Sequence, residues 1–226
     1  MRRILVISPH TDDELFGCGG TLLKLKERGD QIKLAVMSCT PRFLFHLNRV
    51  VSSEEQWAEF ANSANILSTE SPEWYQTSEN KRLEQEPTYE VIRWLDKLIM
   101  RFKPTTIFIP EPSYHQEHQI VYKTSIAACR PTYGDRAMQD VLLYEIPTST
   151  WGGPDLIYKP NIYVDISKQI DSKIDIFKNI YKVQHTEEKR NLLGEKGIRA
   201  HARYRGIESS QEYAESFMLI RSTSIF

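Results

Sequence analysis

A short apolar run near the beginning of the chain leads directly into a cluster of charged residues. Residues 4–7 read Ile-Leu-Val-Ile, which is the pattern of a strand covered on both faces, as in a parallel sheet. Residues 10–14 then contain one histidine and three carboxylates, and residues 15–28 have the apolar spacing of a helix. Because ligands bind where the strands of an open parallel sheet end, we expect the functional site at this turn.

The charged cluster allows two interpretations. Asp12 or Asp13 could cap the following helix by accepting hydrogen bonds from its free backbone N–H groups. One carboxylate is sufficient for that role, whereas this cluster also holds His10 and Glu14. Carboxylates packed this closely repel one another unless a cation is present, and a histidine with carboxylates can supply both a metal ligand and a base. We therefore favour a catalytic metal site over a cap.

Three glycines lie in the first turns of the predicted helix, at residues 17, 19 and 20. They could form a phosphate-binding loop, but they lack the Rossmann spacing and the lysine and serine that end a P-loop. We expect instead that these small residues allow the helix to pack closely on the sheet.

A second polar cluster follows another predicted strand. Residues 105–109 have the pattern of a buried strand, and residues 114–118 read Tyr-His-Gln-Glu-His before a further helix. His115 and His118 are three residues apart and can face one cation. By themselves they are more often surface histidines, since a zinc site needs three or four converging groups. Their position on the same sheet edge as the first cluster favours a shared metal site.

Helical and strand patterns alternate along the rest of the chain. This alternation predicts an α/β fold, a Rossmann-like, mostly parallel sheet with helices on both faces. We find no internal repeat or linker and expect a single domain over residues 1–226. Residues 39–51 are predicted to be a loop, and residues 68–87 a polar surface excursion around a short strand. The remaining predicted strands cover residues 31–38, 141–146 and 161–165, and the remaining helices cover 54–67, 89–102, 119–129 and 166–184.

The C-terminal part of the chain is basic before it becomes apolar. Residues 189–205 contain six Lys and Arg side chains, which could form a solvated helix face or a rim that attracts a substrate phosphate or carboxylate. Residues 213–220 are apolar enough to return to the body of the fold. The candidate substrate-binding residues are Arg203 and Arg205 in this run, with Arg49 and Tyr114 near the two polar clusters.

Composition excludes several classes of protein. The 226 residues carry 29 basic and 30 acidic side chains, so no net charge favours binding to nucleic acid or to an anionic membrane. The three cysteines are far apart and match no paired metal motif. The first apolar run is too short for a signal peptide or a membrane span. We therefore expect a cytoplasmic enzyme with a small-molecule substrate, no nucleic-acid partner and no membrane span, and the sequence leaves open whether it forms a homo-oligomer.

Three segments of the chain resemble one enzyme family. Residues 9–14 (Pro-His-Thr-Asp-Asp-Glu), 115–118 (His-Gln-Glu-His) and 213–217 (Tyr-Ala-Glu-Ser-Phe) are similar to motifs of the PIG-L/LmbE family of zinc-dependent N-acetylglucosaminyl deacetylases. The likeness extends over nearly the whole chain, including residues 143–147 and 161–167. It implies a Rossmann-like fold and removal of the N-acetyl group from an N-acetylglucosamine derivative, either a sugar conjugate or a sugar nucleotide.

The resemblance also implies a role for each polar residue. The family's zinc ligands fall on His10, Asp13 and His118, and its general base falls on Asp12. Asp12 would take a proton from a water molecule that Zn²⁺ makes more acidic. His115 would steady the negative charge that develops on the amide oxygen.

Two positions depart from the family pattern. Thr11 stands where the family usually has proline, which affects the turn and not a ligand. Gln116 and Glu117 stand where the family usually has Pro-Asp. Glu117 is expected to lie near His115, and its additional methylene group alters that contact. No proposed ligand is missing.

Two other functions compete with deacetylation. The same zinc site could hydrolyse a non-acetyl amide or an ester, or a non-catalytic protein of this fold could keep the metal as a structural element. Asp12 argues against the second alternative, since a structural zinc needs no base. We therefore predict a metal-dependent hydrolase that acts on a small N-acetylated amino sugar and uses Zn²⁺ or another divalent transition metal.

Overall fold

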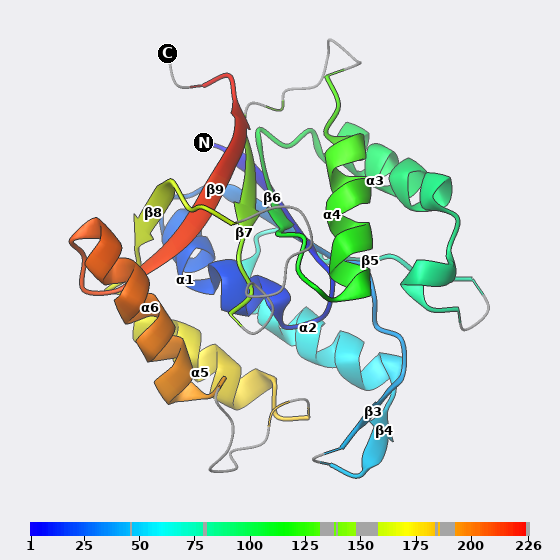
Figure 1. The fold of residues 1–226 in the computed structure, drawn as a ribbon, viewed down its shortest axis with the longest axis horizontal. Coiled ribbons are helices and arrows are strands. Elements are labelled where there is room, and N and C mark those ends of the chain that lie inside the picture. The colour runs from blue at the N-terminus through cyan, green and yellow to red at the C-terminus, as the bar shows by residue number, and fades with distance from the viewer. Residues whose placement is uncertain are drawn as a thin grey trace.

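A central sheet organises the structure, which is a computed structural model (Figure 1). The structure describes residues 1–45, 47–78, 81–131, 138, 140–147, 158–183, 185 and 193–224. Within these residues the sheet has seven strands in the order β5-β2-β1-β6-β7-β9-β8. Their bounds are β1 (Arg3–Ser8), β2 (Gln31–Val36), β5 (Glu73–Trp74), β6 (Thr106–Pro110), β7 (Asp140–Tyr144), β8 (Ile162–Asp165) and β9 (Ala214–Ser222).

The sheet is mostly parallel, as predicted. β1 pairs in parallel with β2 and with β6, β2 pairs in parallel with β5, and β6 pairs in parallel with β7. β9 lies between β7 and β8 and is antiparallel to both. The apolar C-terminal segment therefore returns to the sheet, and Figure 1 shows it in red beside β7.

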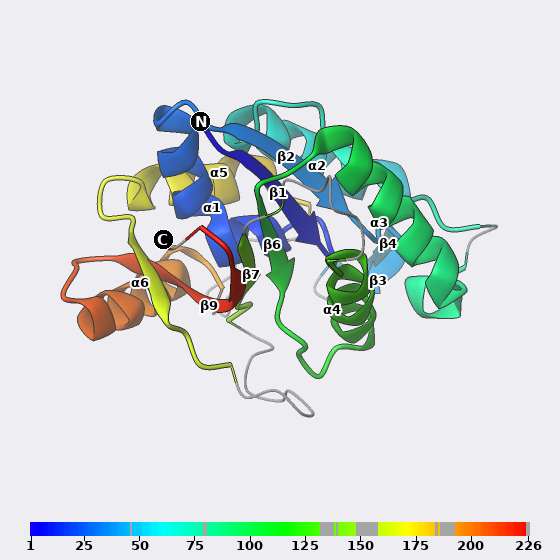
Figure 2. The ribbon, with the colours of Figure 1, turned by 90° about the horizontal axis from the view of Figure 1, so that it is seen from above.

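Helices cover both faces of the sheet (Figure 2). One hydrophobic layer includes Leu22, Phe60, Ile174 and Ile198 from α1, α2, α5 and α6. The layer on the other face is formed largely by α3 and α4. Burial on both faces explains why β1 and β6 are continuous apolar runs. No described helix combines the length and the apolar character that crossing a bilayer requires. The helices are α1 (Asp13–Glu27), α2 (Ser53–Leu67), the 3-10 helix η1 (Leu83–Gln85), α3 (Thr88–Phe102), α4 (Gln116–Ala128), α5 (Ile170–Ile180) and α6 (Glu195–Ser209).

Several predicted boundaries differ from those in the structure. α4 begins at Gln116 and not at residue 119, because its first turn is polar and the side chain of His115 caps it. The predicted loop at residues 39–51 contains an antiparallel hairpin of β3 (Arg42–Leu44) and β4 (Arg49–Val51). α5 is shorter than predicted at both ends. Three residues of the predicted loop and of the basic run, His46, Lys189 and Arg190, lie outside the described residues.

Two glycines of α1 allow the close packing that the sequence predicted. A Cβ atom at Gly17 would lie 2.2 Å from the ring of Tyr144, which is a residue of β7. A Cβ atom at Gly20 would lie 2.9 Å from the side chain of Ile166. The helix thus approaches the sheet at a distance that a larger side chain would prevent. This packing places the first turn of α1 over the carboxyl end of the sheet.

Candidate active site

Three possible ligand atoms meet at the carboxyl end of the sheet. Nδ1 of His10 lies 3.3 Å from Oδ2 of Asp13 and 3.2 Å from Nε2 of His118. The Asp13 oxygen and the His118 nitrogen are 3.5 Å apart. All three side chains are buried. We call these residues the His10–Asp13–His118 triad.

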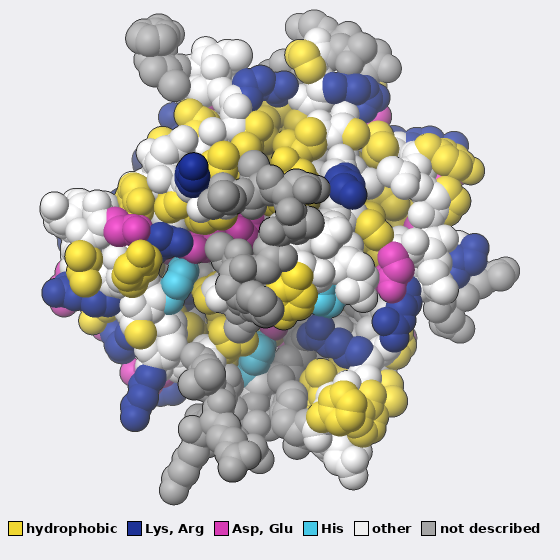
Figure 3. Space-filling view, viewed as in Figure 1, with side chains coloured by type: hydrophobic (Ala, Val, Ile, Leu, Met, Phe, Trp, Pro, Cys, Tyr) yellow, Lys and Arg dark blue, Asp and Glu magenta, His cyan; other side chains and the backbone are white. Residues whose placement is uncertain are grey.

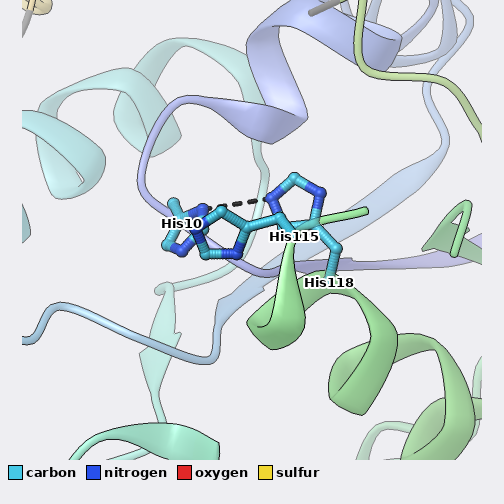
Figure 4. A group of neighbouring side chains, drawn as sticks. All are labelled: His10, His115 and His118. Carbon is cyan, nitrogen blue, oxygen red and sulfur yellow. Dashed lines mark hydrogen bonds between the residues drawn. The ribbon is translucent and has the colours of Figure 1, made fainter. Parts of the chain in front are cut away.

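The topology of the sheet explains why the triad forms. β1 and β6 are adjacent and parallel, so the turns that follow them lie at the same edge. His10 comes two residues after the end of β1, and His118 lies in the first turn of α4, which follows β6. Figure 4 shows His10, His115 and His118 close together, with the two later histidines coming from the start of α4. The predicted convergence of the two polar clusters is therefore present in the structure.

Each histidine of the triad makes a second hydrogen bond through its other ring nitrogen. Oε2 of Glu117 accepts a hydrogen bond from Nε2 of His10 at 2.7 Å, and Ser38 donates to the other carboxylate oxygen at 3.0 Å. The hydroxyl of Ser113 lies 2.9 Å from Nδ1 of His118. These contacts fix both rings so that their remaining nitrogens face Asp13.

Glu117 lies near His115, as expected. Its backbone N–H donates to Nδ1 of His115 at 3.3 Å, and its carboxylate is close enough to interact electrostatically with that ring. The hydrogen bonds of the carboxylate, however, are to His10 and Ser38. The longer side chain of glutamate extends from α4 to the turn after β1, where the buried imidazole of His10 offers an N–H donor.

Asp12 occupies the N-cap position of α1 but does not cap the helix, because its side chain makes no cap hydrogen bond. Its Oδ2 instead accepts a hydrogen bond from Nε2 of His185 at 2.7 Å. The ring of His185 packs against Phe16 and Phe177, with centroid distances of 5.4 and 5.1 Å. Asp12 is therefore held beside the triad by a residue far away in the sequence.

His115 lies next to the triad, but its ligand atoms are not as close to those of His10 and His118 as the Asp13 oxygen is. Its ring centroid lies 4.8 Å from that of His10 and 4.9 Å from that of His118. A ligand atom of each of the three histidines lies within 4.8 Å of the others. The distances among His10, Asp13 and His118 are shorter, so the set that contains Asp13 is the tighter one.

Burial and charge shift the titration of these groups in different directions. Burial alone would lower the pKa of His10, but the carboxylates of Asp13 and Glu117 outweigh it and raise the pKa to about 9. Burial lowers the pKa of His118 to about 4. For Asp12, burial alone would raise the pKa, but the hydrogen bond from His185 and nearby positive charge hold it below its ordinary value. The carboxylates of Asp13 and Glu117 thus favour positive charge at this position, whether a proton or a metal ion carries it.

The triad fits a divalent metal ion. Tetrahedral zinc with bonds of about 2.0–2.2 Å to nitrogen and oxygen places neighbouring ligand atoms about 3.4 Å apart. The three separations in the triad, 3.2, 3.3 and 3.5 Å, agree with this value. Two imidazoles and one carboxylate are also ligands that zinc and other divalent transition metals accept.

A cavity of about 120 Å³ opens beside the triad. His10, His115 and Glu117 line it on one side. Figure 3 shows histidine side chains at the surface near the centre of this face. Lys and Arg side chains lie between one of these histidines and the hydrophobic side chains over the β3–β4 hairpin. The other residues that line the cavity are Ser38, Thr40, Pro41, Arg42, Gln56, Arg82 and Gln116.

The four candidate substrate-binding residues lie outside this lining, as far as the described residues show. Arg49 pairs with Glu55, and the exposed Tyr114 lies in the turn before α4. Arg203 donates to the backbone carbonyl of Glu212. Arg205 pairs with the buried Glu145 and with Glu208. Their role in substrate binding stays a prediction.

The basic residues at the cavity are instead Arg42 and Arg82. Arg42 lies in the predicted loop 39–51, which directly follows the predicted strand over residues 31–38, so its position after a strand end was a usable signal. His185 gave no such signal, because it is separated from Asp12 by 173 positions. Glu14, in the first polar cluster, turns away from the triad and hydrogen-bonds to Ser63 and Tyr181.

Comparison with known proteins identifies the family. The family model described as GlcNAc-PI de-N-acetylase, PIG-L, matches residues 5–129, a span that includes both polar clusters. The chain is also 26% identical over 172 residues to the Escherichia coli (strain K12) protein described as uncharacterized deacetylase YaiS, covering 74% of this chain and 83% of that protein.

Solved structures share the fold. The N,N'-diacetylchitobiose deacetylase of Pyrococcus horikoshii aligns with a TM-score of 0.77 and 20% identity, over 97% of this chain and 84% of that chain. GalB, the 4-carboxy-2-hydroxymuconate hydratase of Pseudomonas putida KT2440, aligns with a TM-score of 0.75 and 18% identity, over all of both chains. Proteins with different activities thus have this fold, and the fold alone does not identify the reaction. The match over residues 5–129 shows that the chain belongs to the PIG-L family of de-N-acetylases.

Proposed function

We propose that the protein is a metal-dependent hydrolase that removes the acetyl group from an N-acetylated amino sugar, with N-acetylglucosamine as the reacting unit. The observation that carries this proposal is the geometry of the His10–Asp13–His118 triad, whose three separations suit one metal ion. Membership of the de-N-acetylase family supports the amide chemistry. In this proposal His10, Asp13 and His118 hold Zn²⁺ or a related divalent ion.

The metal supplies Lewis-acid chemistry when it is bound, polarising the amide carbonyl and making water easier to deprotonate. Asp12 serves as the general base, since its carboxylate lies next to the triad and does not cap the helix. It takes one proton from the attacking water and returns a proton to the leaving amine. The C–N bond breaks, and acetate and the free amino sugar are the products.

Two further histidines assist the reaction in different ways. The hydrogen bond from His185 orients the carboxylate of Asp12 and keeps it an acceptor. His115, partly buried at the start of α4 and close to both triad histidines, serves as a hydrogen-bond donor to the amide oxygen as negative charge builds on it.

Acetate release tests the proposal directly. Protein loaded with zinc is incubated with N-acetylglucosamine, with conjugates of this sugar, and with amides and esters that contain no acetyl group. We expect acetate from the N-acetylated sugars, loss of that activity after chelation, and recovery when metal is returned. Metal-loaded protein that releases no acetate from any N-acetylated sugar would contradict the proposal. Hydrolysis of the other amides or esters alone would favour the rival zinc amidase or esterase.

A further inference from the structure

Three neighbouring cavities lie along the surface, and the first of them is beside the triad. The cavity beside His10 and a second cavity of about 240 Å³ share Thr40 and Pro41 in their linings. The second cavity and a third, of about 500 Å³, share Tyr75, Gln76 and Lys81. Shared lining residues mean that the three cavities adjoin one another. We call the second and third cavities together the distal groove.

Aromatic side chains line the distal groove. Trp74 lies in the second cavity, Tyr75 in both, and Tyr89 and Trp94 in the third. Three of these rings are held in place by other aromatic rings. Trp74 stacks on Trp57 at a centroid distance of 5.8 Å, and Tyr75 meets Trp94 edge to face at 5.6 Å. Trp74 and Trp94 are partly exposed, and rings fixed in this way present apolar surface to a ligand at low entropic cost. Tyr75 is nearly buried and supports Trp94 from behind.

Tyr89 differs from the other three aromatic residues, because it stands at the start of α3 with 65% of its surface exposed. An exposed aromatic residue on a groove wall has its face available to a ligand. A single exposed aromatic residue is common on protein surfaces and does not by itself indicate a binding site. Its position beside Trp94 and Tyr75 in one cavity makes it part of an aromatic wall.

Polar side chains accompany the aromatic rings, and their charges balance. Gln76, Ser53, Thr77 and Ser78 supply neutral donors and acceptors. The cationic side chains of the groove are matched by acidic ones, so that it has little net charge and does not favour a phosphate or a nucleotide. Those cations are Lys81, Arg93 and Lys97, and the acids are Glu54, Glu86 and Glu90.

The chemistry of a sugar chain matches this lining. A pyranose ring has C–H groups on its faces, which pack on aromatic rings, and hydroxyl groups around its edge, which need neutral hydrogen-bond partners. We propose that the distal groove binds the additional sugar units of a neutral oligosaccharide whose N-acetylated unit lies at the triad. This inference rests on the proposed function and specifies its substrate class. Tyr89 is a substrate-stacking residue in this arrangement.

Chain-length dependence tests the inference. The metal-loaded protein is assayed for acetate release from N-acetylglucosamine and from its β-1,4-linked oligomers of two to four units. We expect the specificity constant to rise at least tenfold from the single sugar to the trimer. Tyr89→Ala should lower the ratio of trimer to single sugar by about tenfold, and Tyr89→Trp, which keeps an aromatic face, should restore most of it. Tyr204→Ala is the matched control, because Tyr204 is a tyrosine on α6 with 56% of its surface exposed. In this variant the ratio of trimer to single-sugar specificity constants should equal that of the parent.

A binding measurement separates this inference from the deacetylase proposal. Binding of the same oligomers is followed by the fluorescence of the tryptophans, two of which line the groove. Affinity that increases with oligomer length in the parent, and increases less in Tyr89→Ala, would support sugar binding in the distal groove even if no acetate were released. Acetate release that is equal for all lengths, with equal binding of single sugar and tetramer, would overturn the groove and leave the deacetylase proposal in place.

Discussion

The carboxylate of Glu117 accepts a hydrogen bond from Nε2 of His10 at 2.7 Å. This contact orients the ring so that Nδ1 faces Asp13 and His118. In metal sites, a carboxylate behind a histidine ligand fixes its tautomer and strengthens its donor nitrogen. Glu117 is therefore a positioning residue of the proposed metal centre, although it provides no ligand itself.

Replacement of Glu117 should weaken metal binding. We expect Glu117→Gln to lower the affinity for Zn²⁺ by about 10- to 100-fold, the usual cost of losing such a partner. Glu117→Asp keeps the charge and should retain more affinity than the glutamine variant. Competition with a chromogenic chelator measures the affinity, and Gln116→Ala, on the same turn, should match the parent. A glutamine variant with the parent's affinity would show that this hydrogen bond has no role in binding.

The choice between Asp13 and His115 as the third ligand can be tested by metal content. We expect Asp13→Ala and His118→Ala to lose the bound metal at low metal supply, because each removes a ligand from the triad. His115→Ala should keep it, since His115 lies farther from the other ligand atoms than Asp13 does. Elemental analysis of the purified variants provides the measurement. Loss of metal in His115→Ala with retention in Asp13→Ala would replace our triad with the three histidines.

Asp12→Asn should separate catalysis from metal binding. The variant cannot take a proton from water, so we expect turnover to fall by about a hundredfold or more. Its metal content should stay at the parental level, because Asp12 points to His185. Acetate release and elemental analysis are measured on the same preparation. Near-parental turnover would exclude Asp12 as the base, and loss of metal would make it a ligand.

A buried ion pair away from the triad should affect stability and its pH dependence. Burial alone would raise the pKa of Glu145, but hydrogen bonds from His201 and Arg205 outweigh it and lower the pKa from 4.5 to about 2. The stabilisation is therefore present above the unfolded-state pKa and is lost as the pH falls from about 4.5 to about 2. We expect Glu145→Gln to cost about 3 kcal/mol at pH 7, because it leaves Arg205 without its buried partner.

Denaturant unfolding at a series of pH values measures this effect. The gap between parent and Glu145→Gln should narrow as the pH falls from about 4.5 towards about 2. Glu208→Gln removes the exposed partner of the same Arg205 and should change the free energy of unfolding by less than about 1 kcal/mol. A constant gap across the whole pH range would show that the charge of Glu145 does not stabilise the fold.

Local pattern was sufficient to predict a mostly parallel sheet and the edge at which the two polar clusters meet. Strands buried on both faces produce unbroken apolar runs, as in residues 4–7, and the polar residues that follow them are adjacent in sequence to the strand ends. His10, Asp13 and His118 could therefore be placed at one edge before their distances were known. The glycines of α1 were likewise predictable, because close packing depends on the size of the local side chain.

Tertiary structure alone decided which side chains pair across that edge. The carboxylate of Glu117 hydrogen-bonds to His10 and Ser38, and that of Asp12 hydrogen-bonds to His185, which is 173 positions away. Among the described residues, the basic side chains that line the cavity are Arg42 and Arg82, and none comes from the C-terminal run. Periodicity reports which face of an element a residue occupies, but a hydrogen bond depends on the reach and direction of two side chains from separate elements. Those quantities exist only once the elements have packed together.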